Sequence, residues 1–337
     1  MPNLDPDYTE FYSRIYVSTE IESVQGQAAA LDRSFYVRQC LLNFGETYEK
    51  DPTVNGFLNQ LGITRDSKRA SGLLGGYLAP DMVAWAFKMA CGASPVSTLV
   101  TPSTSVREHV FNAITHPPAT FTFMKQLAAI PNYTEKWSGN GITKLVIRSG
   151  SEQVSMEVHV GALGAQYQQR VAEPNITPVR AGEDYLLGVS SQLLIDGTRL
   201  PAGLFGSGWT ITIEPGQDVL DTGGSSDGSA TRFDLTTERR LTASFDLYET
   251  STVYMADFLA GAFHSYEFQV PGPVIDPVTG LTSLVSVMLS RARIVNNFRS
   301  EITGQGIYRI PLVLEGVIDQ STGFDHVVRI RNLQPGY

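Results

Sequence analysis

The chain has 337 residues, of which 42% are hydrophobic and 18% charged, and its formal net charge is −9. This composition excludes an intrinsically disordered chain, and the length exceeds that of one usual hydrophobic core, so we expect two domains. Acidic residues outnumber basic ones, and no cluster of Lys and Arg stands out. The charge therefore argues against tight sequence-specific binding of nucleic acid, which usually needs a basic face.

The two cysteines, Cys40 and Cys91, have neither metal-site spacing nor a disulfide pattern. We interpret them as small buried side chains in a reducing compartment, with a single disulfide as the alternative. Residues 1–8 lack the basic and apolar regions of a signal peptide, and no run of about 18 apolar residues predicts a transmembrane helix. We expect a soluble protein made in a cytoplasm, without contact to a membrane.

Taken in chain order, the elements form a weak internal repeat. A first strand is predicted at 13–20. Residues 68–77 read as a strand opened by basic residues and followed by a helix over 81–90, and residues 239–248 repeat this order with a helix over 252–260. We expect the two halves to superpose as one fold used twice.

Both predicted helices carry boundary signals. Pro80 suits a first turn, Asp81 complements the positive helix start, and Gly92 and Gly261 suit the left-handed position that ends a helix. Apolar side chains at helical spacing predict a face turned to the core in each: Val83, Phe87 and Ala90 in the first, and Met255, Phe258 and Leu259 in the second.

After each helix the chain predicts further strands. Residues 120–124 parallel 265–270, and paired strands follow at 142–148 with 153–160 and at 283–294 with 307–317. In the segment 153–160, Val154, Met156, Val158 and Val160 alternate with the polar Gln153, Ser155, Glu157 and His159. One face of an antiparallel sheet is therefore packed and the other wet, and we expect the four polar residues to face a lumen or the outer surface.

Two long insertions interrupt the pattern, at 45–66 and at 197–237. Long loops in compact domains are often functional, and these carry large apolar residues that a solvated loop has little use for. We predict contacts between subunits or rings through Phe57, Leu58, Leu61, Leu204, Phe205 and Trp209. The alternative is that these side chains fold back onto their own domain.

Periodicity is lost over 161–182, which places a domain boundary there. We expect a first domain at 1–165, a linker at 166–182, a second domain at 183–319 and a C-terminal extension at 320–337.

The five histidines form no catalytic, metal or cofactor motif. His109 and His116 could share a helical face, but we interpret them as surface or cap residues. Residues 203–208 have the wrong glycine spacing for a dinucleotide loop. Ser226 has GxSxG spacing in a Gly/Ser-rich stretch without the strand and helix that a nucleophile elbow needs. We expect no enzyme, no metal and no cofactor.

The order of elements, together with the phrases TERRLTASFDL, ADFLAGAFHSYEFQV and GIYRIPLVLEGVID, resembles the tail tube proteins of long-tailed bacteriophages in the version with two fused tube domains. The resemblance covers roughly residues 11–319. It implies a mainly β fold, a β-sandwich or half-barrel with a short flanking helix, present twice.

The resemblance also implies a function. Six tube domains make a ring, so three chains would form a pseudo-hexamer, and stacked rings would form a virion tail tube through which DNA is ejected without specific binding. Partners would be further copies of the chain and other tail proteins, such as the tape measure, terminator and baseplate, and assembly would occur in the host cytoplasm. A neutral-to-acidic lumen would keep DNA sliding. A tail terminator, baseplate hub or secretion tube of the same fold is one alternative, and a carbohydrate-binding or hydrolytic β-sandwich is another.

Overall fold

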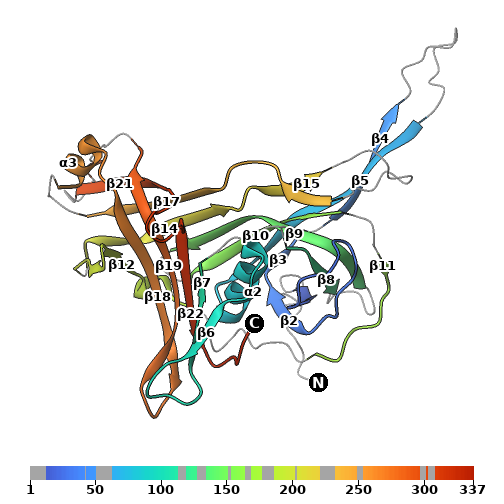
Figure 1. Cartoon of the computed structure of the whole chain (residues 1–337), viewed down its shortest axis with the longest axis horizontal. Coiled ribbons are helices and arrows are strands. Elements are labelled where there is room, and N and C mark those ends of the chain that lie inside the picture. Colours follow the sequence, from blue (N-terminus) through green and yellow to red (C-terminus); the bar gives the residue numbers. More distant parts are fainter. Residues whose placement is uncertain are drawn as a thin grey trace, which may run out of the picture.

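The structure is a computed structural model that describes residues 13–41, 43–50, 63–112, 119–126, 134–150, 153–163, 168–176, 186–201, 203–220, 232–248, 253–296, 301–302 and 308–337. It is mainly β, as predicted, with antiparallel pairing between the strands (Figure 1). Among the described residues, no helix is both long enough and apolar enough to cross a membrane.

In the described part of the first half, the chain forms eleven strands and the long helix α2 (Pro80–Cys91). The strands are β1 (Ser13–Val17), β2 (Arg33–Val37), β3 (Gln39–Cys40), β4 (Asn43–Lys50), β5 (Ile63–Tyr77), β6 (Val96–Leu99), β7 (Arg107–Phe111), β8 (Phe121–Gln126), β9 (Thr134–Ser149), β10 (Ser155–Ala162) and β11 (Gln168–Gln169). The predicted pair 142–148 and 153–160 is confirmed, since β9 and β10 run antiparallel with Ile147 opposite Met156.

The second half begins with a short 3₁₀ helix, η1 (Gly188–Ser190), and contains the helix α3 (Val253–Ala260). Its strands are β12 (Gln192–Ile195), β13 (Thr198–Arg199), β14 (Phe205–Glu214), β15 (Gln217–Leu220), β16 (Arg232–Leu235), β17 (Arg240–Leu247), β18 (His264–Asp276), β19 (Leu281–Ile294), β20 (Glu301–Ile302), β21 (Tyr308–Gly316) and β22 (His326–Asn332). The predicted pairing of 283–294 with 307–317 is confirmed where β19 meets β21.

Six strands lie side by side in the order β5–β10–β9–β14–β17–β21, and we call this section the central sheet. The junction between the halves of the chain lies inside it, because β9 pairs with β14 from Ser149 opposite Trp209 to Leu145 opposite Ile213. The expectation that 197–237 is a long loop is therefore wrong for its described part. That part contains four strands, and one of them lies in the middle of the sheet.

The C-terminal residues are likewise integrated into the fold. β22 lies between β19 of the second half and β7 of the first, with Val328 opposite both Val287 and Phe111. Val328 and Ile330 are fully buried. The segment expected to be an extension thus forms a core strand that joins the two halves.

Helix α2 fills the core beneath the central sheet, and all twelve of its residues are buried. Pro80 occupies the first turn and Gly92, with φ 70°, ends the helix, both as predicted. Val83, Phe87 and Ala90 face the core, while Trp85 packs edge-on against Phe121 with ring centroids 5.0 Å apart. The helix is buried all round because it contacts both β9 of the central sheet and the layer of β7, β22 and β19.

Helix α3 differs from α2 in its surroundings. Leu259, which the helical spacing placed on a core face, is 74% exposed, so that prediction is wrong. The side chains of Met255 and Phe258 lie outside the described set. One hydrophobic core spans described residues of both halves, from Ile15 to Ile330. The division into two domains and their superposition remain predictions.

Candidate functional surface: the open face of the central sheet

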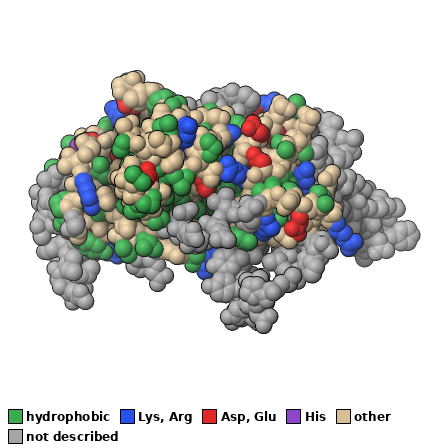
Figure 2. All heavy atoms as spheres, turned by 90° about the horizontal axis from the view of Figure 1, so that it is seen from below, with side chains coloured by type: hydrophobic (Ala, Val, Ile, Leu, Met, Phe, Trp, Pro, Cys, Tyr) green, Lys and Arg blue, Asp and Glu red, His purple; other side chains and the backbone are tan. Residues whose placement is uncertain are grey.

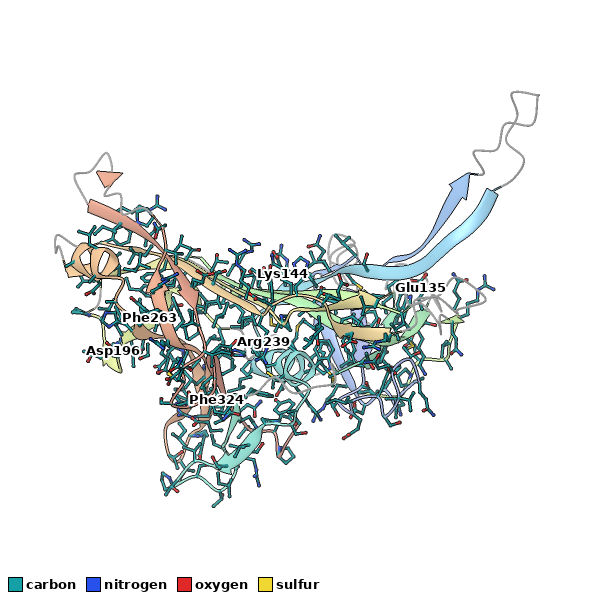
Figure 3. All side chains as sticks on the ribbon, turned by 45° about the horizontal axis from the view of Figure 1, so that its top comes forward. Glu135, Lys144, Asp196, Arg239, Phe263 and Phe324 are labelled. Atoms are coloured by element: carbon teal, nitrogen blue, oxygen red, sulfur yellow. The ribbon has the colours of Figure 1, made fainter. Side chains whose placement is uncertain are left out.

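Strand alternation gives the central sheet one packed face and one open face. On the packed face, facing residues such as Met156 and Ile147, or Ala243 and Leu314, are buried. Their sequence neighbours point to the other side, because successive side chains of a strand lie on opposite faces. Figure 3 shows the sheet above α2, with Lys144 labelled on the side away from that helix.

The open face is polar, and its charges balance. Where the six strands lie side by side, the charged side chains that the structure describes are four basic and four acidic ones: Lys144, Arg148, Arg240 and Arg309, and Glu157, Glu214, Asp246 and Glu315. Between them lie Thr210, Thr212, Thr242 and Ser244 on β14 and β17. The charged side chains described on this face therefore carry no net charge, and a few apolar ones, such as Leu73 and Val313, lie between them.

Ion pairs between neighbouring positions neutralise these charges locally. Arg148 Nε lies 3.2 Å from Glu157 Oε1, and Lys144 Nζ lies 3.1 Å from Glu214 Oε1. These two pairs link β9 to the strands on its two sides, β10 and β14. A third pair, in which Arg309 Nη2 lies 2.9 Å from Asp246 Oδ2, links β17 to β21. The pairs are partly exposed, so each contributes little stability, and their main effect is on the surface potential.

His159 adds no positive charge to this face near neutral pH. Burial lowers the pKa of its imidazole below the ordinary 6.5, although Glu157 opposes the shift. A neutral imidazole leaves the carboxylate of Glu157 to Arg148. Along the described part of the open face, a polyanion would thus meet paired charges and hydroxyl groups, without a surplus of cations to hold it.

Of the four residues predicted on the wet face, Ser155, Glu157 and His159 lie on β10 and on this surface, whereas Gln153 precedes β10 and forms an isolated bridge with Leu187. Gln153, Ser155, Glu157 and His159 are all half-buried, while Val154, Met156, Val158 and Val160 are buried. Their sequence alternation therefore appears in the structure, and whether they line a lumen remains a prediction. The sequence reasoning missed their partners on β9, β14 and β21. The alternation of polar and apolar residues in β17 is a sequence signal that could have placed Thr242, Ser244 and Asp246 on the same face.

The six residues predicted to contact other subunits have three different outcomes. Phe57, Leu58 and Leu61 lie outside the described residues. Trp209 is only 3% exposed and packs on Phe268, with ring centroids 5.4 Å apart, so it belongs to the core of its own chain and its assignment as a surface contact is wrong. The reason is that β14 is a sheet strand and places alternate side chains inward. Leu204 and Phe205 are half-buried, and a contact through them remains a prediction.

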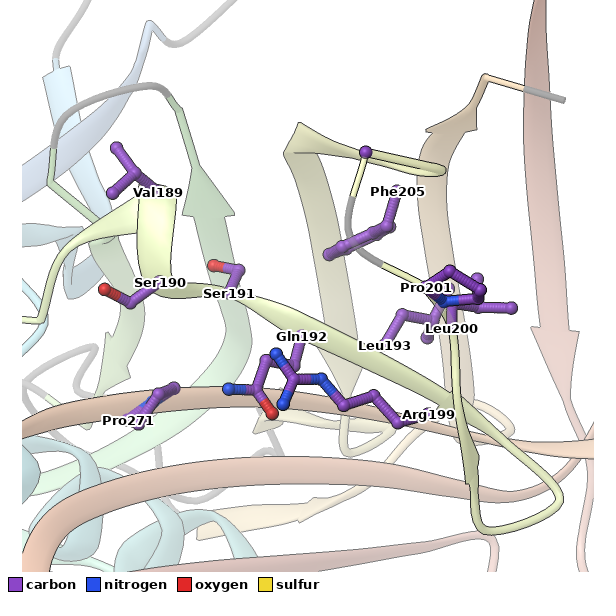
Figure 4. Close-up of a pocket in the computed structure, with 11 residues that line it drawn as sticks. Val189, Ser190, Ser191, Gln192, Leu193, Arg199, Leu200, Pro201, Phe205 and Pro271 are labelled. Carbon is purple, nitrogen blue, oxygen red and sulfur yellow. The ribbon is translucent and has the colours of Figure 1, made fainter.

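Phe205 also lines a hollow of about 370 Å³ beside β12 (Figure 4). The wall combines apolar side chains, such as Leu193 and Pro271, with the polar Gln192 and the cationic Arg199. None of the described residues that line it is Asp, Glu or His. It therefore lacks the pair of carboxylates that glycoside hydrolysis normally uses.

Buried histidines have structural partners. His109, read as a surface or cap residue, is instead fully buried, and its ring nitrogens lie 2.7 Å from Ser97 Oγ and 3.0 Å from Asn332 Oδ1. His326 Nδ1 lies 2.7 Å from Asp325 Oδ1. The nearby Ser290 points to the opposite face of β19, so these three residues do not form a Ser–His–Asp triad. Among the described residues no cluster of three or more His, Cys, Asp or Glu could hold a metal ion, and His116 lies outside them.

A second exposed surface is formed by the tips of two hairpins, β6–β7 and β18–β19. They lie side by side in Figure 1, and a hydrogen bond from Ser103 lowers the pKa of Asp276. Val278 is 95% exposed and Val274 54%. Seen from below, this part of the molecule shows many apolar side chains with acidic and basic groups scattered between them (Figure 2).

Comparison with known proteins gives one finding. The sequence model of a family described as phage tail tube protein matches residues 13–298, which is most of the chain. No match is found among curated proteins.

Proposed function

We propose, from the premise that this chain belongs to the phage tail tube protein family, that copies of it assemble into stacked rings forming the hollow tail tube of a virion. The tube is the conduit for genome ejection, and the role is structural, without catalysis. Three chains with two tube domains each make one pseudo-hexameric ring. The other partners of the chain are tail proteins such as the tape measure, terminator and baseplate, and assembly takes place in the host cytoplasm.

The observation that supports this most is the open face of the central sheet. It is a continuous antiparallel surface across both halves of the chain, with α2 on its other side. Joining such sheets edge to edge around a ring would satisfy their free edges and enclose a channel. The paired charges, such as Lys144 with Glu214, suit a wall along which DNA slides without binding.

A projecting arm is a second observation in favour of stacked rings. β4 and residues 63–69 of β5 form a two-stranded ribbon that extends away from the body (Figure 1). An isolated two-stranded ribbon is marginally stable in water. A neighbouring copy in the assembly would give this ribbon the contacts that its own chain does not supply.

The test is to purify the protein at high concentration and examine it by negative-stain electron microscopy and sedimentation velocity. We expect rings and tubes for the wild type. Replacing residues 51–61 with a short Gly/Ser linker should leave a folded, soluble chain that no longer forms tubes. Loss of the β-sheet signal in circular dichroism would place the segment in the core, and normal tubes would exclude it as an anchor.

Wild-type protein that stays monomeric under all conditions, or that fails to appear in purified virions, would contradict the proposal. Rings that never stack would favour the same-fold alternative of a tail terminator. Quantifying the protein in virions separates these further, because a tube protein is present in many copies and a terminator or hub in few.

A further inference from the structure

A hairpin of the second half packs on the first half of the chain. β15 and β16 pair with each other from Gln217 opposite Leu235 to Leu220 opposite Arg232, and within the described residues they form a two-stranded sheet of their own. We call this hairpin the finger. It lies between β14 and β17 in the chain and contacts β9 and β10 (Figure 1). A two-stranded ribbon is marginally stable in water, so the finger depends on the surface that it covers.

The finger carries Phe233, whose ring fills a socket in the first half. Phe233 is 1% exposed and clusters with Val219 of the finger and with Leu163, apart from the main core. The rest of the socket is formed by Gly141 and Gly161, which lie opposite each other on β9 and β10. A Cβ at Gly141 would lie 2.3 Å from the Phe233 ring. Gly141 has no left-handed φ, so the aromatic ring, and not the backbone, requires glycine there.

The register of β10 puts the socket on the open face of the central sheet. Val160 belongs to the main core, and Gly161, the next residue, points to the other side, like His159. The seated finger therefore covers one end of the face that we propose as the channel wall. A finger that left the socket would be free to stand in the channel.

Hydrogen bonds hold both strands of the finger. Gln25 Nε2 donates to the carbonyl oxygen of Phe233, and Gln25 Oε1 accepts from the Phe233 N–H, each at 2.8 Å. Gln217, which is 4% exposed, donates from Nε2 to the carbonyl oxygen of Ile142 at 2.6 Å. The side chain of Gln25 thus satisfies the backbone of Phe233 as a neighbouring strand would, and each bond joins the second half to the first.

A buried carboxylate fixes the loop that carries Gln25. Glu22 is 6% exposed and accepts hydrogen bonds from the N–H groups of Gly26 and Gly139, at 2.9 and 3.0 Å, and from the Thr122 hydroxyl at 2.9 Å. These partners lie on the same loop, on β9 and on β8. Buried polar groups are stable when they are hydrogen-bonded in this way. The first half therefore presents Gln25 and the socket as one fixed seat.

The base of the finger is pinched. Gly216, with φ 79°, precedes β15, and its carbonyl oxygen accepts hydrogen bonds from the N–H groups of both Thr236 and Thr237. Glu214 and Arg240, just outside this base, already belong to the β14–β17 pairing. The finger can thus leave its seat without breaking the central sheet. Opening such a unit costs less than global unfolding, because few apolar contacts are lost.

We propose, on the basis of the ring-forming function above, that the finger is a clasp that locks the second half of the chain onto the first, and that chains enter rings with the clasp closed. Three chains close a ring of six domains only if the two halves of each chain keep one angle. The finger adds a link between the halves to the pairings of β9 with β14 and of β22 with β7. The closed clasp also keeps the finger against the channel wall.

The decisive variant is Gly141→Ala. The added methyl group takes the place of the Phe233 ring, which is enclosed, so the finger must leave. We expect amide hydrogen exchange in residues 217–220 and 232–235 to become at least about tenfold faster, the factor that about 1.4 kcal/mol gives, while exchange in β17 stays unchanged. Gly208→Ala is the matched control, because Gly208 also lies in a strand and a Cβ there would meet nothing within 4 Å.

A double variant tests whether the socket and the ring act through one contact. Phe233→Ala alone should also speed exchange in the finger. Without the aromatic ring the methyl group at position 141 has room, so Gly141→Ala combined with Phe233→Ala should exchange no faster than Phe233→Ala alone. Additive effects of the two substitutions would overturn the socket.

Sedimentation velocity on the full chain tests the role in assembly. Faster exchange together with a higher concentration needed for ring formation in Gly141→Ala, and neither change in Gly208→Ala, supports the proposal. Unchanged exchange, or faster exchange with normal rings, overturns it while the ring function stands. If the wild type forms no rings, the proposed function and the assembly role of the clasp both fail. If Gly141→Ala does not fold, Gln25→Ala, at a half-buried loop position, replaces it with the same readouts.

Discussion

At the residue scale, Cys91 at the end of α2 shows what burial does to reactivity. It is 2% exposed, and burial raises the pKa of its thiol to about 12. Because the thiolate is the reactive form, we expect Cys91 to resist a thiol reagent in the native protein at mildly alkaline pH. Cys40, which is half-buried, should react first. Counting reactive thiols before and after unfolding in denaturant checks this, and equal native rates for both would contradict it.

His109 makes stability depend on pH. Burial lowers the pKa of its imidazole below 6.5, its ordinary value. The unfolded chain therefore takes up a proton there at a higher pH than the folded chain does. This contribution to stability is present above pH 6.5 and is lost as the pH falls through the folded pKa.

Replacing the imidazole should reduce that dependence. We expect His109→Gln to flatten the fall in unfolding free energy between neutral and mildly acidic pH, measured by denaturant titration at several pH values. His159 has a pKa shift in the same direction, so some slope should remain, and His159→Gln is the companion variant. A His109→Gln slope identical to that of the wild type would be inconsistent with this account.

At the element scale, β22 is a core strand, and this can be tested with matched substitutions. Ile330 on β22 is fully buried, whereas Ile318, between β21 and β22, is 56% exposed. Ile330→Ala should destabilise the chain by about 2–5 kcal/mol, the usual cost of truncating a buried isoleucine. Ile318→Ala should change stability by no more than about 0.5 kcal/mol. Chemical denaturation measures both, and equal effects would show that β22 is not part of the core.

At the scale of the whole molecule, the balanced open face predicts how an assembled tube treats DNA. Glu214 pairs with Lys144 and lies opposite Arg240. Glu214→Gln should leave these cations uncompensated in every copy, so tubes should bind short duplex DNA more tightly and with stronger salt dependence. Glu20→Gln, at an exposed position outside the central sheet, removes the same charge and is the control. Fluorescence anisotropy gives the readout, and equal binding by both variants would contradict a lumen role for this face.

Local signals in the sequence determined several features. The alternation of 153–160 and of 241–247 is the same as the burial pattern of β10 and β17, because the period of two is a property of the strand itself. Pro80 and Gly92 delimited α2, since each acts through its own backbone. The phrases of the second half indicated the tail tube family, which the family model shows.

Only the tertiary structure decided which strands meet. Nothing near 205–214 in sequence indicates that β14 pairs with β9, and nothing near 326–332 indicates that β22 joins β19 to β7. For the same reason Trp209 was assigned to the surface and Leu259 to the core, and the structure reverses both. Ion pairs of the open face, such as those of Lys144 with Glu214 and of Arg309 with Asp246, also arise between strands distant in sequence. Pairing between distant strands depends on the register and packing of the whole sheet, which no local pattern of residues contains.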